Sequence, residues 1–194
     1  MNDDLSIRRL VFAAMMAAMI SVGAYLAIPI GPVPIVLQNL FVLVAGLLLG
    51  SRWAAISVGV YLLAGACGLP VFAGGTGGVG RLIGPTGGYL FGFLGAAYLV
   101  GLIAERARGR FFWEVLAMVI GSLIIYAFGV GWLKFVTGMT LSKTLAVGCY
   151  PFLPGDAIKM AVALPIARTV RPLIQGFSPN SSSRWLSKTG NTDN

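Results

Sequence analysis

The sequence predicts an all-α fold: a polytopic membrane protein built as a bundle of six transmembrane helices, with a glycine-rich outer loop between helices 3 and 4. Three observations support this prediction. Hydrophobic residues make up 57% of the 194 residues and charged residues only 10%, whereas a soluble domain carries about 25% charged residues. The hydrophobic residues are gathered in long runs. The basic residues interrupt these runs instead of forming one patch, which is typical of membrane topology and argues against nucleic-acid binding.

The first three helices follow from the hydrophobic runs and the breaks between them. A helix that crosses a bilayer needs about 20 mostly apolar residues. The first run begins after Arg8 and Arg9 and ends at PIGPVP (29–34), where three prolines prevent a helix from continuing. The segment GSRW (50–53) separates the next two runs, which are short for a bilayer. The expected spans are residues 10–28, 35–50 and 54–67.

The last three helices lie beyond a glycine-rich connection, residues 68–89, that has no helical periodicity. The basic segment ERARGR (105–110) ends the fourth run, and Pro154 with Gly155 interrupts the sixth. Residues 1–176 then form one membrane domain. Residues 177–194 are rich in serine and asparagine, and we expect them to be a disordered cytoplasmic tail. The expected spans of this half are residues 89–104, 112–133 and 144–167.

The basic residues are distributed unevenly between the two sides that six crossings would define. Inner segments, counted with a cytoplasmic N-terminus, hold ten of them: Arg8, Arg9, Arg52, Arg106, Arg108, Arg110, Arg168, Arg171, Arg184 and Lys188. Outer segments hold only Arg81, Lys134 and Lys143. An excess of basic residues marks the cytoplasmic side. We therefore expect a multi-pass protein of the cell (inner) membrane with its N- and C-termini in the cytoplasm.

Two charges lie within the outer half of the sixth expected span, Asp156 and Lys159 of LPGDAIK (153–159). Charged residues inside a membrane normally face a cavity or one another. One interpretation is an i,i+3 ion pair that only supports the helix. The other is a ligand site, in which the carboxylate accepts from N–H groups and the ammonium donates to a carbonyl or carboxylate. We favour the second, because apolar residues could replace a purely structural pair at little cost in stability.

Other polar or irregular segments reach the same outer side. Gln38 and Asn39 open the second span, where they either cap or bridge helices or contact a ligand. Arg81 is either a solvated loop residue or the partner of a ligand carboxylate. Irregular backbone at this depth must be buried in protein or line a cavity, so we expect a pocket that opens to the outside. The candidate ligand-binding residues are Asp156, Lys159, Arg81, Gln38, Thr76 and Tyr89.

Small residues recur in FAAMMAAM (12–19) of the first expected span. Ala13 pairs with Ala17, and Ala14 with Ala18, at a spacing of four residues. Such a stripe lets another helix approach closely. Spacing alone favours packing within the bundle, and docking onto a partner subunit is the alternative.

Four segments together resemble the BioY family, the biotin-specific S components of energy-coupling-factor (ECF) transporters. They are, in this order, GPVPIVLQNL (31–40), VFAGGTGG (71–78), GPTGGYLFGF (84–93) and LPGDAIK (153–159). The resemblance extends over about residues 8–170. It implies six helices, a cytoplasmic N-terminus and a biotin pocket near the outer face. It also implies that the stripe on the first helix docks onto the membrane coupling (T) subunit, with Ala13, Ala14, Ala17 and Ala18 as its members.

The resemblance further implies which residues bind the ligand. The LPGDxxK motif of the family falls on Asp156 and Lys159. Relatives also use an arginine and an asparagine; Arg81 is the candidate by position, and residues 68–89 contain no asparagine. The chemistry of biotin agrees with this set. Its ureido ring offers two N–H groups and a carbonyl to Asp156 and Lys159, and its carboxylate needs a cation such as Arg81 or Lys159.

The expected function is high-affinity capture of biotin from the outer side and its delivery inward with a coupling subunit and cytoplasmic ATPase subunits. Only those partners would use ATP, because the chain has neither Walker motif. We expect no enzyme, no catalytic residue, no cofactor and no metal site, since the chain lacks histidine and its two cysteines lack metal spacing.

Two other functions remain as alternatives. One is a membrane enzyme with Asp156 as general base and Lys159 as acid, and the lack of a second acid in the outer half argues against it. The other is a stand-alone secondary transporter or channel for a small organic acid. An inverted repeat would support that alternative, and we find none between residues 1–100 and 101–194.

Overall fold

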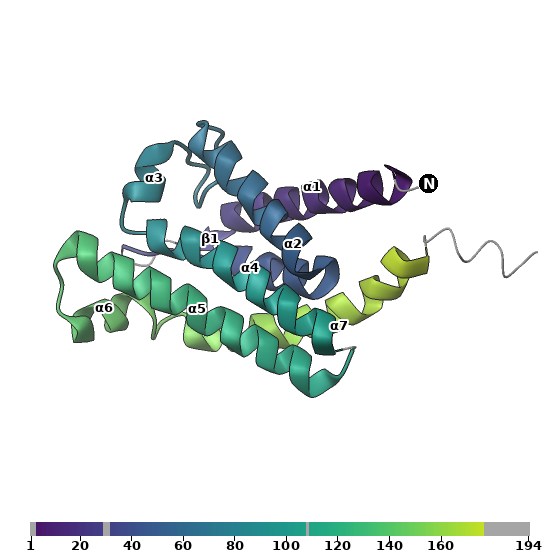
Figure 1. The fold of residues 1–194 in the computed structure, drawn as a ribbon. Helices are drawn as coiled ribbons and strands as arrows, with labels where there is room; N and C mark the ends of the chain where they lie inside the picture. Colours follow the sequence, from purple (N-terminus) through teal and green to yellow (C-terminus); the bar gives the residue numbers. More distant parts are fainter. Residues whose placement is uncertain (1–2, 29–31, 108, 177–194) are drawn as a thin grey trace, which may run out of the picture.

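The computed structural model describes residues 3–28, 32–107 and 109–176, and most of them are helical (Figure 1). The expected tail, residues 177–194, lies outside the described residues. The all-α prediction is confirmed, since the two strands are only two residues long. The elements follow one another as α1 (Asp3–Tyr25), β1 (Ala27–Ile28), β2 (Ile35–Val36), α2 (Gln38–Ala66), α3 (Val79–Ile83), α4 (Gly87–Ala107), α5 (Phe111–Thr137), α6 (Leu141–Gly148) and α7 (Leu153–Gly176).

Within the described residues, four helices are long and apolar enough to cross a membrane: Ile7–Tyr25 within α1, and the whole of α2, α4 and α5. This agrees with a multi-pass membrane protein. The described residues hold seven helical elements, and one of them, α2, joins two helices across a non-helical residue, so the predicted count of six is not confirmed. Helix α2 covers two predicted spans, the sixth predicted span is divided between α6 and α7, and α3 is an additional short helix.

The boundary predicted between the second and third spans is a break inside α2. Gly50 has φ +77° and ψ 176°, which is not helical and which a residue with a side chain adopts only with strain. The carboxylate of Glu105 on α4 fills this break. It accepts hydrogen bonds from the backbone N–H of Ser51 at 2.7 Å and from the Ser51 hydroxyl at 3.1 Å. Glu105 therefore caps the second half of α2, which is a separate helix beyond the break.

The division of the sixth predicted span lies at a different place from the one expected. A turn at residues 149–152 separates α6 from α7. Pro154 and Gly155 lie in the first turn of α7 and do not interrupt it. A proline is tolerated there because the first N–H groups of a helix have no intrahelical partner. Asp156 consequently lies in the first turn of α7, where the helix dipole favours a carboxylate.

The glycine-rich connection is more ordered than the sequence predicts. It contains α3 and an isolated bridge between Phe72 and Thr76. Gly74 and Gly75 between them have φ values of +73° and +69°, which explains the choice of glycine for this turn. The turn buries the Phe72 ring, which contacts Tyr61 edge-on at 5.4 Å between ring centroids. The connection is thus anchored to α2.

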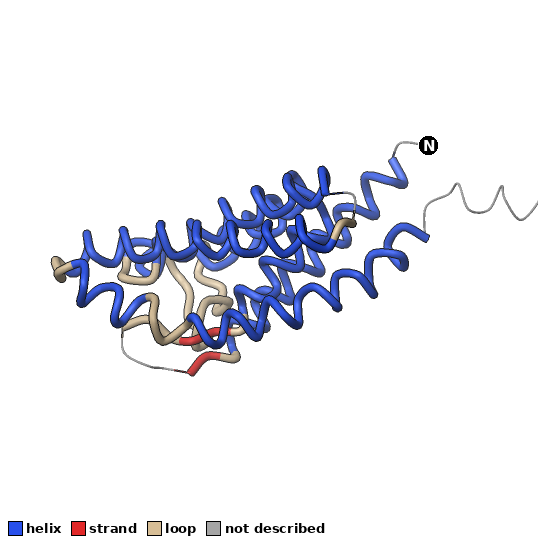
Figure 2. The backbone as a smooth tube through the Cα atoms, turned by 90° about the horizontal axis from the view of Figure 1, so that it is seen from below, coloured by secondary structure: helices blue, strands red, loops and turns tan. Residues whose placement is uncertain are grey.

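Helix α4 packs against both α2 and α5 and forms the centre of the bundle (Figure 1). Glycines permit this close contact. A Cβ at Gly101 would collide with the α2 backbone at Ser51, and a Cβ at Gly88 would collide with Trp132 of α5. Helix α1 packs against α2, and α7 contacts both α2 and α5. Figure 2 shows that the two strands and most loops lie away from the N-terminus.

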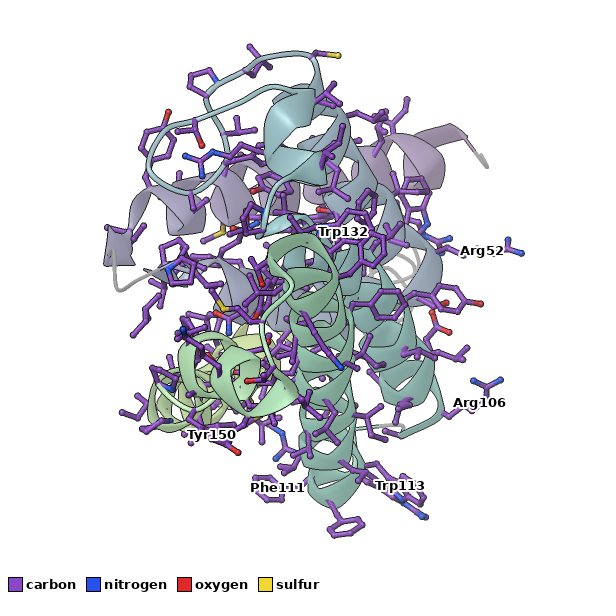
Figure 3. All side chains as sticks on the ribbon, turned by 90° about the vertical axis from the view of Figure 1, so that its left-hand side faces the viewer. Arg52, Arg106, Phe111, Trp113, Trp132 and Tyr150 are labelled. Atoms are coloured by element: carbon purple, nitrogen blue, oxygen red, sulfur yellow. The ribbon has the colours of Figure 1, made fainter. Side chains whose placement is uncertain are left out.

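Arginine and exposed aromatic side chains mark the end of the bundle that contains the α4–α5 turn. Arg106, Phe111 and Trp113 project outward there (Figure 3), and Phe111 is 61% exposed. Aromatic and basic residues are typical of the boundary between membrane and water. This end is the one that the distribution of basic residues predicts to be cytoplasmic.

The alanine stripe of α1 is divided between two environments. Ala13 and Ala17 are buried, and the hydroxyl of Ser57 on α2 donates to the Ala13 carbonyl at 2.8 Å. Ala14 and Ala18 are exposed. Ala13 and Ala17 thus pack inside this chain and Ala14 and Ala18 lie on an exposed face, and docking of the stripe onto a partner stays a prediction.

Candidate ligand-binding site

A cavity of about 700 Å³, counting its open mouth, lies where β2, the start of α2, the glycine-rich connection, α4, α5 and the start of α7 meet. Most of its wall is apolar, including Phe72, Phe93, Ile125 and Phe152. All six candidate residues of the sequence analysis line it, together with Asn39 and Tyr126. Their polar side chains are Gln38, Asn39, Thr76, Arg81, Tyr89, Tyr126, Asp156 and Lys159.

Asp156 is the centre of the polar part of the cavity. Its side chain is buried, with the residue 6% exposed. Its Oδ1 accepts hydrogen bonds from Asn39 Nδ2 at 2.6 Å and from Lys159 Nζ at 2.9 Å, and its Oδ2 accepts from the Tyr126 hydroxyl. Lys159 Nζ also donates to the Val36 carbonyl at 2.7 Å. Three side chains from three helices thus hold one carboxylate.

Asp156 and Lys159 each have one hydrogen-bonding position that no other residue occupies in the described part of the chain. A carboxylate has about four lone-pair positions and an ammonium three N–H groups. Asp156 uses three of its positions on side-chain donors, and Lys159 uses two of its N–H groups. The intrahelical ion pair of the structural interpretation is therefore present. It is one part of a larger network that can still accept one hydrogen bond and donate another.

The sequence analysis singled out neither Thr86, which also lines the cavity, nor Tyr126. Tyr126 lies 30 residues before Asp156, in the middle of α5. The surrounding residues are a continuous hydrophobic run, and nothing in that run separates a tyrosine that faces the cavity from one that faces lipid.

Gln38 and Asn39 keep polar atoms without partners. Gln38 is only 2% exposed, and its Nε2 has no hydrogen-bond partner among the described residues. Asn39 Oδ1 is likewise buried and unpaired in this part of the chain. Leaving a buried polar group unpaired costs about 1–3 kcal/mol. The N-cap residue of α2 is Leu37, which makes no side-chain capping hydrogen bond, so neither Gln38 nor Asn39 caps this helix.

The hydroxyls of Thr76 and Tyr89 already have backbone partners. Thr76 Oγ1 donates to the Ala73 carbonyl at 3.0 Å and Tyr89 donates to the Gly148 carbonyl at 2.6 Å. The first bond stabilises the turn of the glycine-rich connection, and the second holds α6 against α4. Both residues line the cavity, so they shape its wall, and a direct role in binding stays a prediction.

Arg81 supplies the second positive charge of the cavity. It lies on α3, is exposed, and forms no salt bridge within the described ranges. Lys159 and Asp156 neutralise each other, so Arg81 leaves the cavity with one net positive charge. This charge favours a ligand that carries one negative group beside an apolar body.

A second charged cluster lies at the opposite end of α7. Glu114 of α5 is fully buried and pairs with Arg168 Nη2 at 3.0 Å and Arg171 Nη1 at 2.5 Å. Arg171 also donates to the Leu47 carbonyl at 3.0 Å, and Arg168 to the Gly109 carbonyl at 3.2 Å. These bonds tie α7 to α5, to the end of the first half of α2 and to the α4–α5 turn. The orientation of α7 is therefore fixed far from the cavity.

Similar proteins are known for nearly the whole chain. A sequence model of the BioY family matches residues 1–176. A "Biotin transporter BioY" of Thermotoga maritima is 45% identical over 166 residues, covering 86% of this chain and 97% of that protein. One of Rhizobium etli is 40% identical over 179 residues, covering 86% and 94%. A solved structure, the S-component for biotin from an ECF-type ABC transporter, has a TM-score of 0.82 at 35% identity, covering 88% of this chain and 94% of its own.

Proposed function

The chain belongs to the BioY family, as its motifs predicted, and we propose that it is the biotin-binding S component of an ECF-type uptake transporter. The observation that supports this function most is the cavity itself. It joins a hydrogen-bonding carboxylate–ammonium pair, a largely apolar wall and one unpaired cation. Its relatives are named as transporters and not as enzymes.

Each part of biotin has a counterpart in the cavity. The ureido ring can donate an N–H to the free position of Asp156 and accept from the remaining N–H of Lys159. Phe72 and Phe93 can enclose the sulfur-containing ring and the alkyl chain. The carboxylate of biotin can accept a charge-assisted hydrogen bond from Arg81.

Energy for uptake would come from other proteins. The sequence has no Walker motif, so we propose that a membrane coupling subunit and cytoplasmic ATPase subunits drive inward delivery. In this topology both termini are cytoplasmic and the cavity faces outward. The test is uptake of labelled biotin by cells without a biotin transporter of their own. Uptake should require the coupling and ATPase subunits, and equal uptake by this chain alone would instead support the stand-alone transporter.

Arg81 is expected to bind the biotin carboxylate. Changing Arg81→Gln should weaken biotin binding about tenfold. This is the low end of what a hydrogen bond to a charged group contributes to the free energy of binding, and we expect the low end because the Arg81 side chain is exposed. Calorimetric titration measures the change. The methyl ester of biotin is the control ligand, because it has no charge to lose, and both proteins should bind it equally. If Arg81→Gln binds biotin as the unchanged protein does, the carboxylate contacts another residue.

We propose that the exposed half of the alanine stripe docks onto the coupling subunit. The double variant Ala14→Leu with Ala18→Leu should reduce co-purification of that subunit by about tenfold or more, since overpacking a close contact costs about 1–3 kcal/mol. Biotin binding should not change. The matched variant Ala13→Leu fills a buried position, so it should lower the unfolding temperature instead. Normal co-purification by the double variant would exclude this surface.

A further inference from the structure

We infer that Lys134 and Lys143 attract the carboxylate of biotin toward the cavity and so speed its capture, although neither residue lines the cavity. The inference rests on the proposed function, because the ligand that it concerns is anionic biotin. It adds a separate property to that function, the rate of association. Both lysines lie outside the cavity wall, on elements that reach the expected outer side.

Lys134 lies in the last turn of α5, beside the short helix that carries Arg81. The indole N–H of Trp132 donates to the carbonyl of Gly84, the C-cap of α3, at 3.0 Å. This bond holds the end of α5 against the segment of Arg81. Along α5, Lys134 lies eight residues beyond Tyr126 of the cavity, which is about 12 Å. Lys134 is therefore placed a short distance beyond the cavity wall.

Lys143 reaches the same end of the bundle from α6. The hydroxyl of Tyr89, a residue that lines the cavity, donates at 2.6 Å to the carbonyl of Gly148 at the end of α6. Lys143 lies five residues before Gly148, about 8 Å along this helix. Figure 1 shows α3 and α6 at one end of the bundle and the N-terminus at the other. Three elements around the cavity thus each carry one basic residue at this end.

The positive charges at this end have no acidic partners in the described part of the chain. Arg81, Lys134 and Lys143 are exposed, and none of them forms a salt bridge there. The described acids other than Asp156 lie toward the opposite end: Asp3 and Asp4 at the start of α1, Glu105 at the end of α4 and Glu114 at the start of α5. Because Asp156 and Lys159 cancel, the three exposed bases give this end a net charge of +3.

A surface field of one sign steers a small ion of the opposite sign toward its site. Such fields raise association rates by about 10- to 1,000-fold, and the effect falls steeply with ionic strength. The Debye length is about 30 Å at 0.01 M salt and about 3 Å at 1 M. At the separations given above, the two lysines should act on biotin at low salt and be screened at high salt. Because they do not touch the bound ligand, they should not affect its dissociation.

The experiment measures the association and dissociation rates of biotin by surface plasmon resonance, with the detergent-solubilised protein immobilised through a terminal tag. The variant is the double change Lys134→Gln with Lys143→Gln. The matched control is Arg52→Gln with Arg106→Gln, which removes the same charge from exposed positions outside the cavity on the expected cytoplasmic side. Biotin methyl ester is the control ligand, because it has no charge for the field to attract.

The lysine double variant should associate with biotin about fivefold more slowly than the unchanged protein at about 0.01 M salt. Steering contributes at least about tenfold, and two of the three charges are removed. The dissociation rate should not change, and at about 1 M salt the two proteins should associate equally fast. The arginine control should keep the unchanged rate. A purely structural role of Lys134 at the end of α5 would lower the unfolding temperature and leave the salt dependence intact.

Two results would overturn the inference and leave the proposed function supported by biotin binding to the unchanged protein. One is an equal association rate for the lysine double variant and the unchanged protein at low salt. The other is an equal slowing of biotin and its methyl ester. If the unchanged protein binds no biotin, the proposed function is wrong and the inference falls with it. Should thermal unfolding show that the double variant does not fold, the single variants take its place, each with an expected slowing of about twofold.

Discussion

Changing Asp156→Asn is expected to weaken biotin binding by about 100- to 4,000-fold. The carboxylate accepts from Asn39, Tyr126 and Lys159, and an amide in its place would present an NH₂ group to one of these donors. Lys159 would also be left as an unpaired charge that is mostly buried. Removing one partner of a buried pair costs about 3–5 kcal/mol, and each 1.4 kcal/mol is a factor of ten in affinity. Calorimetric titration measures the loss.

The matched control is Glu105→Gln, the same chemical change on α4. Glu105 lies 16 residues beyond Tyr89 in the sequence, which is about 24 Å along a helix. Its partner is Ser51 at the break of α2, and it does not line the cavity. Glu105→Gln should therefore bind biotin as the unchanged protein does. An Asp156→Asn protein that keeps full affinity would show that the Asp156–Lys159 pair is only structural.

Changing Glu114→Ala is expected to have the largest effect on stability, a loss of about 3 kcal/mol in the free energy of unfolding. Glu114 is fully buried and pairs with two arginines, and breaking such a pair costs about 3–5 kcal/mol. We expect the lower end because Arg168 is 40% exposed and can turn to water. Thermal unfolding of the detergent-solubilised protein should show a clearly lower midpoint.

Glu114→Gln separates charge from shape at this position. The amide keeps the volume of the side chain and can still accept from one arginine, so the loss should be smaller than for Glu114→Ala. Because saturating biotin stabilises only folded protein, it should raise the midpoint of both variants. Equal midpoints for Glu114→Ala and the unchanged protein would show that the buried pair does not stabilise the fold.

The sequence alone was enough to predict that the chain is a membrane protein and that Asp156 and Lys159, at the start of α7, are candidate ligand-binding residues. Charges are costly inside a membrane, so Asp156 and Lys159 stand out in a hydrophobic run, and their spacing alone places them on one helix face. Arg81 stands out for the same reason. The structure places all three at one cavity.

The partners of these charges could not be predicted in the same way. Tyr126 and Asn39 contact Asp156 from α5 and α2, across sequence separations of 30 and 117 residues. Such contacts depend on how helices pack, and a single tyrosine or asparagine in an apolar run has no pattern that reveals its neighbour. The path of α2 through Gly50 depends likewise on a distant residue, Glu105.

The alanine stripe shows the limit of periodicity. A spacing of four residues finds small side chains that share a helix face, but α1 has one such pair on each of two faces. Only the packing of α1 against α2 shows that Ala13 and Ala17 are buried while Ala14 and Ala18 are not.

The decisive experiment for the proposed function is calorimetric titration of biotin into the purified, detergent-solubilised protein without any partner subunit. We expect tight binding with one biotin for each chain, since every proposed contact comes from this chain alone. An absence of measurable binding to folded protein would contradict the biotin assignment and would leave Asp156 and Lys159 as an internal ion pair.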